Sequence, residues 1–244
     1  MQMIQGKQPR PWRVLLYGTP GIGKSTFAKY APGAGFIDLE DGLSNIDCYR
    51  TPHLKTYKEF MEGMRGLYRD PRCQTVVIDT ADALEKILTY KLLSEAPGNK
   101  ISLNDFGWGK GWDKLVGEWN RILDMIDKFN EGGKNVLIIG HEQVKKFEDP
   151  TSDGYDRYQI QVHKRSSEVI FNRMDAVIFA RYETFVKGGA DEKKKAKGTG
   201  KRILCCIETP AQMAKNRFDL GAAVPMDKPD QVTAANAFFN TLSS

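Results

Sequence analysis

Residues 18–25 read Gly-Thr-Pro-Gly-Ile-Gly-Lys-Ser and fit the pattern G-x-x-x-x-G-K-[ST] at every fixed position. The apolar run Trp12–Tyr17 before them predicts a buried strand, and Ser25–Ala31 after them predicts a helix that Pro32 stops. A glycine-rich turn between a strand and a helix points backbone N–H groups inward, where they attract phosphates. The segment therefore predicts a nucleoside triphosphate site, with ATP expected, formed by Gly18, Thr19, Pro20, Gly21, Ile22, Gly23, Lys24, Ser25 and Thr26.

Two side chains of this segment have expected chemical roles, and a third residue completes the set. Lys24 is expected to reach the β- and γ-phosphates, and Ser25 to offer its hydroxyl to Mg²⁺. Asp79 follows the apolar run Thr75–Ile78, so it lies at the carboxyl end of a predicted strand, where open α/β sheets bind ligands. A carboxylate there can hold Mg²⁺ directly or through water. The sequence therefore predicts ATP and Mg²⁺, with Ser25 and Asp79 at the metal.

Glu40 is the candidate for the residue that orients or deprotonates the attacking water. It follows the strand-like segment Gly35–Leu39, which places it at the same edge of the sheet as Asp79. Asp38 and Asp41 are its competitors. Asp38 lies two positions earlier, on the same side of the strand, whereas Asp41 is expected to face away.

Apolar runs alternate with segments of helical spacing along the whole chain. This order predicts an α/β fold with a mostly parallel sheet covered by helices on both faces. We expect one domain over residues 1–244, with a core at about 12–220 and short extensions at both ends. The expected strands are 12–17, 35–39, 75–78, 136–139, 176–180 and 203–207, and the expected helices are 25–31, 57–68, 84–92, 115–129 and 234–242.

Composition narrows the setting in which the chain works. No apolar stretch is long enough to cross a bilayer, and Met1–Arg13 lacks the apolar run of a signal peptide. The four cysteines show no C-x-x-C spacing, and His141-Glu142 is not followed by the second histidine of a zinc-protease motif. These observations predict a cytoplasmic protein with no membrane contact, no disulfide framework and no structural zinc.

The net charge of +5 is concentrated in one stretch. Residues 187–202 contain seven basic and two acidic side chains, a surplus equal to that of the whole chain. Such a stretch either contacts phosphates or forms a solvated connector, and the sequence leaves both open.

The segment Phe36–Leu43 resembles the strand of RecA-like recombinases that ends in the catalytic glutamate, with Glu40 as the matching residue. Val76–Asp79 resembles their Walker B strand. A closer resemblance, from Arg13 to about Leu220, is to the phage-encoded RecA-like single-strand annealing ATPases of a phage AAA-type nucleotide-binding family. The features that carry this resemblance are the phosphate-binding segment 18–26 (the P-loop), Glu40, Asp105–Trp112 and Ala214–Phe218.

This resemblance implies a RecA-like P-loop ATPase that acts on single-stranded DNA in recombination or annealing. It implies a head-to-tail homo-oligomer, either filament or ring, a possible single-strand-binding protein as partner, and a bacterial host cytoplasm as location. Lys215-Asn216-Arg217 resembles a Lys-Asn-Lys segment of bacterial RecA, so Lys215 and Arg217 would act on the ATP of a neighbouring subunit. The family's polar sensor after the fourth strand is matched first by His141 and second by Gln143. Because the chain is shorter than full recombinases, annealing or loading fits better than strand exchange.

Two segments match the DNA-contacting loops of RecA-like filaments, about 97–112 and 145–165. Both combine aromatic side chains with cations, the combination that binds single strands without sequence preference. The candidate DNA-binding residues are Trp108, Lys110, Trp112, Lys145, Lys146, Arg157, Lys164 and Arg165.

Two other functions are compatible with the same P-loop. A small-molecule kinase would turn over a nucleoside or metabolite without any response to DNA. A nucleotide-switched accessory module for a replication or repair partner would bind ATP but hydrolyse it slowly, unaffected by Glu40→Gln.

Overall fold

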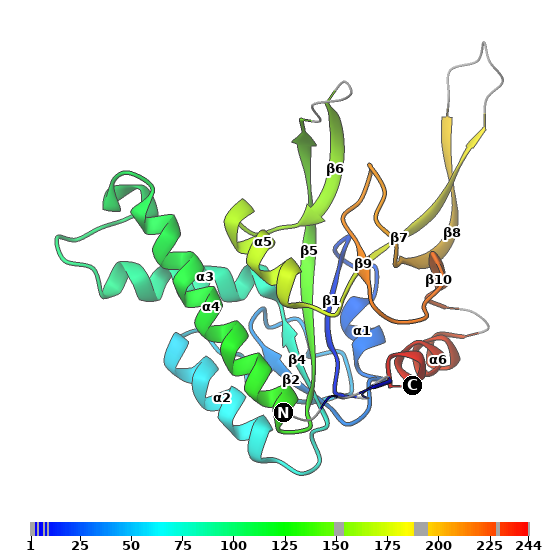
Figure 1. Ribbon diagram of the computed structural model, residues 1–244, viewed down its shortest axis with the longest axis horizontal. Coiled ribbons are helices and arrows are strands. Elements are labelled where there is room, and N and C mark those ends of the chain that lie inside the picture. Colours follow the sequence, from blue (N-terminus) through cyan, green and yellow to red (C-terminus); the bar gives the residue numbers. More distant parts are fainter. Residues whose placement is uncertain are drawn as a thin grey trace.

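Ten strands form the centre of the computed structural model, which describes residues 3, 5–6, 8, 10–148, 154–187, 195–227 and 230–243 (Figure 1). The central path runs β10-β8-β7-β1-β5-β4-β2-β3, with β6 paired to β5 and β9 to β7. The strands are β1 (Arg13–Gly18), β2 (Ala34–Asp38), β3 (Tyr49–Arg50), β4 (Thr75–Asp79), β5 (Asn135–Phe147), β6 (Tyr155–Ile160), β7 (Ala176–Lys187), β8 (Lys195–Cys205), β9 (Lys215–Asn216) and β10 (Ala223–Pro225).

The middle of the sheet is parallel and its outer additions are antiparallel. Strands β7, β1, β5, β4, β2 and β3 pair in parallel, whereas β8, β10, β6 and β9 join antiparallel. Every residue of β4 is buried, because parallel strands covered on both faces have no solvent side. The predicted α/β class with a mostly parallel sheet is therefore confirmed.

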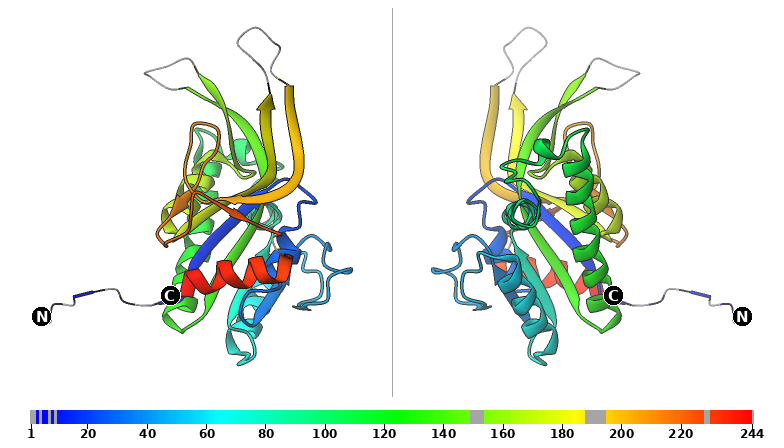
Figure 2. Two further views of the ribbon diagram at one scale, coloured as in Figure 1. Left: turned by 90° about the vertical axis from the view of Figure 1, so that its right-hand side faces the viewer. Right: turned by 90° about the vertical axis from the view of Figure 1, so that its left-hand side faces the viewer.

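Helices cover both faces of this sheet, as Figure 2 shows. One core packs α2 (Tyr57–Arg69), α3 (Ala81–Ser94), α4 (Lys110–Glu131) and α5 (Lys164–Arg173) on one face. The other packs α1 (Lys24–Ala28) and α6 (Gln231–Ser243) on the opposite face, around Trp12, Phe27 and Phe239. In α4 the apolar side chains recur at helical spacing, so Leu115, Trp119, Ile122 and Ile126 are all buried.

Register brings the functional ends of the strands to one edge. Gly18, where β1 ends, lies beside His141 of β5 and Ala180 of β7. Asp38, where β2 ends, lies beside Asp79 of β4. The phosphate-binding segment and the carboxylates therefore meet at the carboxyl edge of the parallel sheet, as expected for this topology.

The structure differs from the expected elements mainly beyond this edge. Strands β5 and β7 continue past the predicted runs, and β8 begins eight residues before its predicted run 203–207. Strand β6 lies where a loop was expected, and α5 was not predicted. The β5–β6 and β7–β8 hairpins project from the sheet (Figure 1). Of the basic stretch 187–202, Lys187 ends β7 and residues 195–202 belong to β8, whereas 188–194 lie outside the described residues. Short elements η1 (Leu103–Phe106), β3, β9 and β10 were also not predicted.

Within the described part of the chain, no helix is both long and apolar enough to cross a membrane.

Candidate nucleotide-binding site

The loop between β1 and α1 has the backbone that its glycines allow. Gly21 and Gly23 have φ angles of 77° and 96°, in the left-handed region that other residues rarely adopt. At Gly18 the reason is space, because a Cβ would stand 2.1 Å from the carbonyl oxygen of Ala180. The loop therefore needs glycine at Gly21 and Gly23 for its backbone conformation, and at Gly18 for close packing against β7.

Lys24 folds back into this loop. Its Nζ donates hydrogen bonds to the carbonyl oxygens of Gly18 at 2.8 Å and Thr19 at 3.0 Å, and only 6% of the residue is exposed. Burial lowers the pKa of Lys24, while the carboxylate of Asp79 opposes this shift. A buried ammonium whose hydrogen bonds go to backbone carbonyls is well placed to take a phosphate oxygen as a stronger partner.

Ser25 and Asp79 lie in direct contact. The Ser25 hydroxyl donates a hydrogen bond of 2.6 Å to Oδ2 of Asp79. Burial raises the pKa of Asp79 to about 6, although the bond from Ser25 lowers it. A hydroxyl and a carboxylate are oxygen ligands that suit Mg²⁺, so this donor set fits the metal. When bound, Mg²⁺ would neutralise charge on the phosphates, with Ser25 and Asp79 holding it.

Glu40 follows β2 and is held by its neighbours. The Thr80 hydroxyl donates to Glu40 Oε1 at 2.7 Å. Asp38 does not compete for the role, because its Oδ1 accepts the backbone N–H groups of Glu40 at 3.2 Å and Asp41 at 2.8 Å and so shapes the turn. Burial raises the pKa of Glu40, while the Thr80 bond lowers it. The result is a carboxylate, with 31% of its side chain exposed, that is held where it could orient an attacking water.

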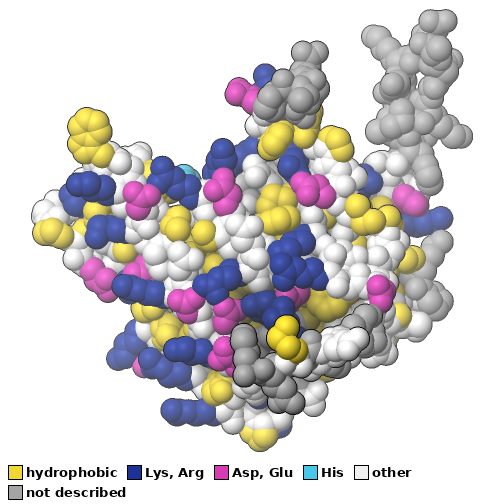
Figure 3. Space-filling view, in the orientation of Figure 1, with side chains coloured by type: hydrophobic (Ala, Val, Ile, Leu, Met, Phe, Trp, Pro, Cys, Tyr) yellow, Lys and Arg dark blue, Asp and Glu magenta, His cyan; other side chains and the backbone are white. Residues whose placement is uncertain are grey.

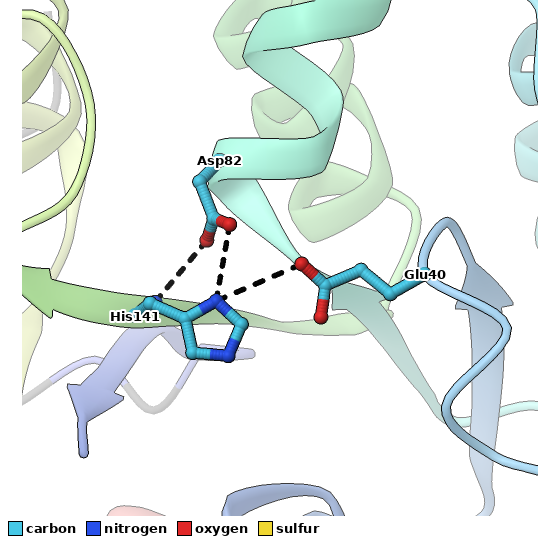
Figure 4. Close-up of side chains that lie close together, drawn as sticks. All are labelled: Glu40, Asp82 and His141. Atoms are coloured by element: carbon cyan, nitrogen blue, oxygen red, sulfur yellow. Dashed lines mark hydrogen bonds and ion pairs between the residues drawn. The ribbon is translucent and has the colours of Figure 1, made fainter. Parts of the chain in front are cut away.

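His141 and Asp82 form the fourth part of the site, next to Glu40 (Figure 4). His141 Nδ1 lies 3.0 Å from Asp82 Oδ2 and 3.6 Å from Glu40 Oε1. Gln143, the second sensor candidate, turns elsewhere, because its Nε2 donates to the carbonyl oxygens of Ile160 and Val162. Sequence reasoning did not identify Asp82 or Thr80. Thr80 is the N-cap of α3 and Asp82 lies in its first turn, and neither belongs to a sequence motif.

These groups surround one cavity of about 270 Å³. Its wall includes P-loop residues, the carboxylates at the strand ends and the histidine of β5, which is the inventory of an ATP-hydrolysing site. The lining residues are Gly21, Gly23, Lys24, Ser25, Thr26, Asp38, Glu40, Gly42, Ile46, Asp79, Thr80, Ile139 and His141.

Arg202 on β8 contacts the outside of the P-loop. Its Nη1 donates to the carbonyl oxygen of Ile22 at 3.1 Å, and its Nε lies 3.2 Å from Asp227 Oδ2. One charge of the basic stretch 187–202 therefore supports the P-loop backbone. The sequence offered no signal for this contact, because 180 positions separate Arg202 from Ile22.

Lys215 and Arg217 lie away from the cavity of their own chain. Strand β9 pairs with Ala176 and Val177 at the start of β7, whereas Gly18 lies beside Ala180, at the other end of the segment of β7 that pairs with β1. Lys215 Nζ donates to the carbonyl oxygens of Phe171 and Asn172, at the end of α5. Arg217 Nη1 lies 3.5 Å from Asp175 Oδ1, and its side chain is 55% exposed. Neither cation is among the residues that line the nucleotide cavity of the same chain.

Four of the candidate DNA-binding residues share one groove. Lys145, Lys146, Arg157 and Lys164 line a cavity of about 550 Å³ between the β5–β6 hairpin and α5. The groove also holds Phe147, which stacks under the Arg157 guanidinium with 5.4 Å between the charged carbon and the ring centroid. Two acidic residues, Glu148 and Glu168, line it as well. Figure 3 shows dark-blue cationic side chains below the β5–β6 hairpin, with acidic side chains interspersed.

The other four candidates belong to the α3–α4 connection and its contact with α5. Trp108 is 98% exposed, whereas Trp112 stacks on the His163 ring at 3.9 Å and donates to Asn104. Lys110 begins α4. Arg165 forms an ion pair with Asp113. Trp108 is thus freely available for contact, while Trp112 has one face already covered.

Fold and cavity together define a P-loop ATPase. Consistently, the family model described as "AAA domain" matches residues 10–218, most of the chain, which therefore belongs to this family of P-loop ATPases. Membership implies that the chain uses a nucleotide, typically with Mg²⁺. Among solved structures, the flagellar accessory protein FlaH from Methanocaldococcus jannaschii is similar, with 9% identity and a TM-score of 0.40 over 89% of this chain and 85% of that chain. No curated protein matches the sequence.

Proposed function

We propose that this AAA-family ATPase is stimulated by single-stranded DNA and acts in recombination or strand annealing, like the phage-encoded proteins that its sequence resembles. The observation that carries the proposal is the course of β5. This strand contributes His141 to the nucleotide cavity and, four residues later, Lys145 to the basic groove. A single continuous strand thus connects the two sites.

The groove has the chemistry of a sequence-neutral strand site. Cations follow the phosphates and an aromatic ring offers a stacking surface, which tolerates any base. Phe147, at the end of β5, is the aromatic residue that lines the groove, and it is 42% exposed. The acidic residues in the groove favour a modest affinity that depends on salt.

The proposal includes a head-to-tail oligomer. In such an assembly the edge that carries β9 can face the nucleotide cavity of the next subunit, because β9 and the P-loop lie at opposite ends of the segment of β7 that pairs with β1. Arg217 would exchange Asp175 for a phosphate of the neighbouring ATP and act as a trans cation. Lys215 would contact that ATP only after breaking its hydrogen bonds to the carbonyl oxygens of Phe171 and Asn172.

ATP hydrolysis with and without a single-stranded oligonucleotide tests the proposal. We expect DNA to raise the rate in the wild type and in Lys58→Ala, which changes an exposed lysine on α2. The double substitution Lys145→Ala/Lys146→Ala should retain the basal rate and lose the stimulation. Lys24→Ala and Glu40→Gln should lose both. A wild-type rate that DNA does not change would refute the proposal, and slow hydrolysis indifferent to Glu40→Gln would support a nucleotide-switched module instead.

A further inference from the structure

Both carboxylate oxygens of Asp82 contact the same residue, His141. Oδ1 accepts the backbone N–H of His141 at 3.2 Å, and Oδ2 lies 3.0 Å from the ring Nδ1 of the same residue. The Asp82 side chain is 9% exposed and leaves α3 toward β5. A two-point contact of this kind fixes the position of the His141 backbone and the rotation of its ring together.

The contact also decides which ring nitrogen meets a ligand. Both carboxylates, of Asp82 and Glu40, lie on the Nδ1 side of the imidazole, and the other ring nitrogen points away from them (Figure 4). His141 lines the cavity that also contains Lys24 and Ser25. With Nδ1 bonded, Nε2 is the nitrogen available to a phosphate oxygen in that cavity.

Three charged groups face the imidazole from three elements: Asp82 on α3, Glu40 after β2 and Lys24 on α1. The hydrogen bond with Asp82 raises the pKa of His141, and burial and Lys24 oppose this rise. Burial alone would raise the pKa of Asp82, but the bonds from His141 outweigh it and hold the value at about 2. The pair therefore favours a charged carboxylate beside an imidazolium, in which Nε2 carries a proton that it can donate.

The N-terminus of α3, the helix that carries Asp82, is capped by another residue. Thr80 is the N-cap of α3, and its hydroxyl oxygen accepts the N–H of Ala83. Because the first turn of α3 is already capped, the orientation of Asp82 toward β5 is not required to start the helix.

We propose that Asp82 is a positioning residue for ATP hydrolysis, which holds His141 so that its Nε2–H donates to the γ-phosphate as charge develops there. The inference deepens the proposed function, since it rests on hydrolysis at this cavity with His141 as the sensor. Asp82 itself touches neither nucleotide nor water in this role. Its effect passes entirely through the imidazole.

Steady-state ATP hydrolysis by single and double variants tests this dependence. Asp82→Asn keeps the size of the side chain but weakens the hold on Nδ1, and we expect kcat to fall about 10- to 100-fold with little change in KM. Since Asp82 acts through His141, Asp82→Asn/His141→Asn should be no slower than His141→Asn alone. Glu118→Gln, which alters another buried, ion-paired carboxylate on α4, is the control for general loss of stability. An unchanged kcat in Asp82→Asn, or losses that multiply in the double variant, would overturn the inference.

A second measurement does not depend on hydrolysis. The chain has only three histidines, so ¹⁵N-labelled imidazole signals can be assigned by substitution. We expect both ring nitrogens of His141 to be protonated in the wild type and their signals to change in Asp82→Asn but not in Glu118→Gln. An unprotonated Nδ1 or Nε2, or signals indifferent to Asp82→Asn, would overturn the inference even in an active enzyme. Absence of wild-type hydrolysis with the expected signals would instead count against the proposed function.

Discussion

The Ser25 hydroxyl on α1 donates a hydrogen bond of 2.6 Å to Asp79 at the end of β4. This contact joins the two halves of the proposed magnesium site before any ligand is added. It also places a carboxylate, 6% exposed, where its charge is costly, because burial raises the pKa of Asp79 to about 6. The buried charge of Asp79 therefore destabilises the free protein, and Mg²⁺ bound with a nucleotide would reduce this destabilisation.

Asp79→Asn should separate the stability of the free protein from its response to Mg·ATP. We expect the nucleotide-free variant to be at least as stable as the wild type, because it no longer buries a charge. Saturation at about 100 times Kd should stabilise the wild type by about 2.7 kcal/mol and the variant by much less. Thermal denaturation with and without Mg·ATP measures both effects. Glu62→Gln, at an exposed position of α2, should behave as wild type, and an equal Mg·ATP shift in Asp79→Asn would contradict the assignment.

His141 should make stability depend on pH. Its pKa is raised by Asp82 above the ordinary value, so the native state binds the proton more tightly than the unfolded chain. The resulting stabilisation is complete below about pH 6.5, the unfolded value, and is lost as pH rises through the raised native pKa. We therefore expect His141→Gln to lower the free energy of unfolding more at about pH 6 than at about pH 9. Urea denaturation at both values measures this, and an effect that is larger at high pH would show that His141 is neutral in the native state.

The sequence predicted the parallel core because each central strand is a short, continuous apolar run. Val76–Ile78 and Val136–Ile139 are buried on both faces of the sheet. Such strands are continuous apolar runs, which can be recognised without knowing the neighbouring strands. The β5–β6 hairpin left no such pattern. Its outer part, such as Tyr155–Gln159, alternates half-buried and exposed residues instead of forming a continuous apolar run, so it was interpreted as a loop.

Site residues were predictable where a motif fixes their spacing. The P-loop and the strand-end acids Glu40 and Asp79 have positions set by local structure, and the fold brings them together. Asp82 and Arg202 could not be found in this way. Each acts through a contact between distant segments, 59 positions from Asp82 to His141 and 180 from Arg202 to Ile22, and only the folded topology supplies those contacts.

The basic groove should give single-stranded DNA binding a measurable salt dependence. Each phosphate neutralised on a single strand contributes a slope of about −0.7 in log K against log salt concentration. Removing Lys145 and Lys146 should therefore make the slope less steep by about 1 to 1.5, as well as weaken binding at low salt. Fluorescence anisotropy with a labelled oligonucleotide measures the slope. Lys58→Ala serves as the matched control, and an unchanged slope in the double variant would exclude the groove as the DNA site.

Trp108 should report directly on contact with DNA. Trp12 and Trp119 are 1% and 0% exposed, and Trp112 is stacked on His163, so quenching by an added strand would come mainly from Trp108. If a base stacks on it, Trp108→Ala should weaken binding by about 1–3 kcal/mol. Trp108→Phe should retain part of the affinity, because it keeps an aromatic face. Titration by fluorescence and anisotropy tests both variants, and equal affinity in wild type and Trp108→Ala would remove this connection from the DNA surface.

Two glycines of α4 should respond to alanine with opposite signs. At Gly111 a Cβ would stand 2.0 Å from the carbonyl oxygen of Leu103, so the helix and η1 must move apart, at about 1–3 kcal/mol of stability. At Gly117 a Cβ meets nothing within 4 Å, and Gly117→Ala should stabilise the helix by about 0.5–1 kcal/mol. Urea denaturation compares the two. Neither substitution loses helix propensity, although Gly111 stands in the first turn of α4 and Gly117 in its interior, so a loss of stability at Gly111 would come from the contact with Leu103. A stabilised Gly111→Ala variant would mean that η1 does not pack on α4 closely enough to fix the connection that presents Trp108.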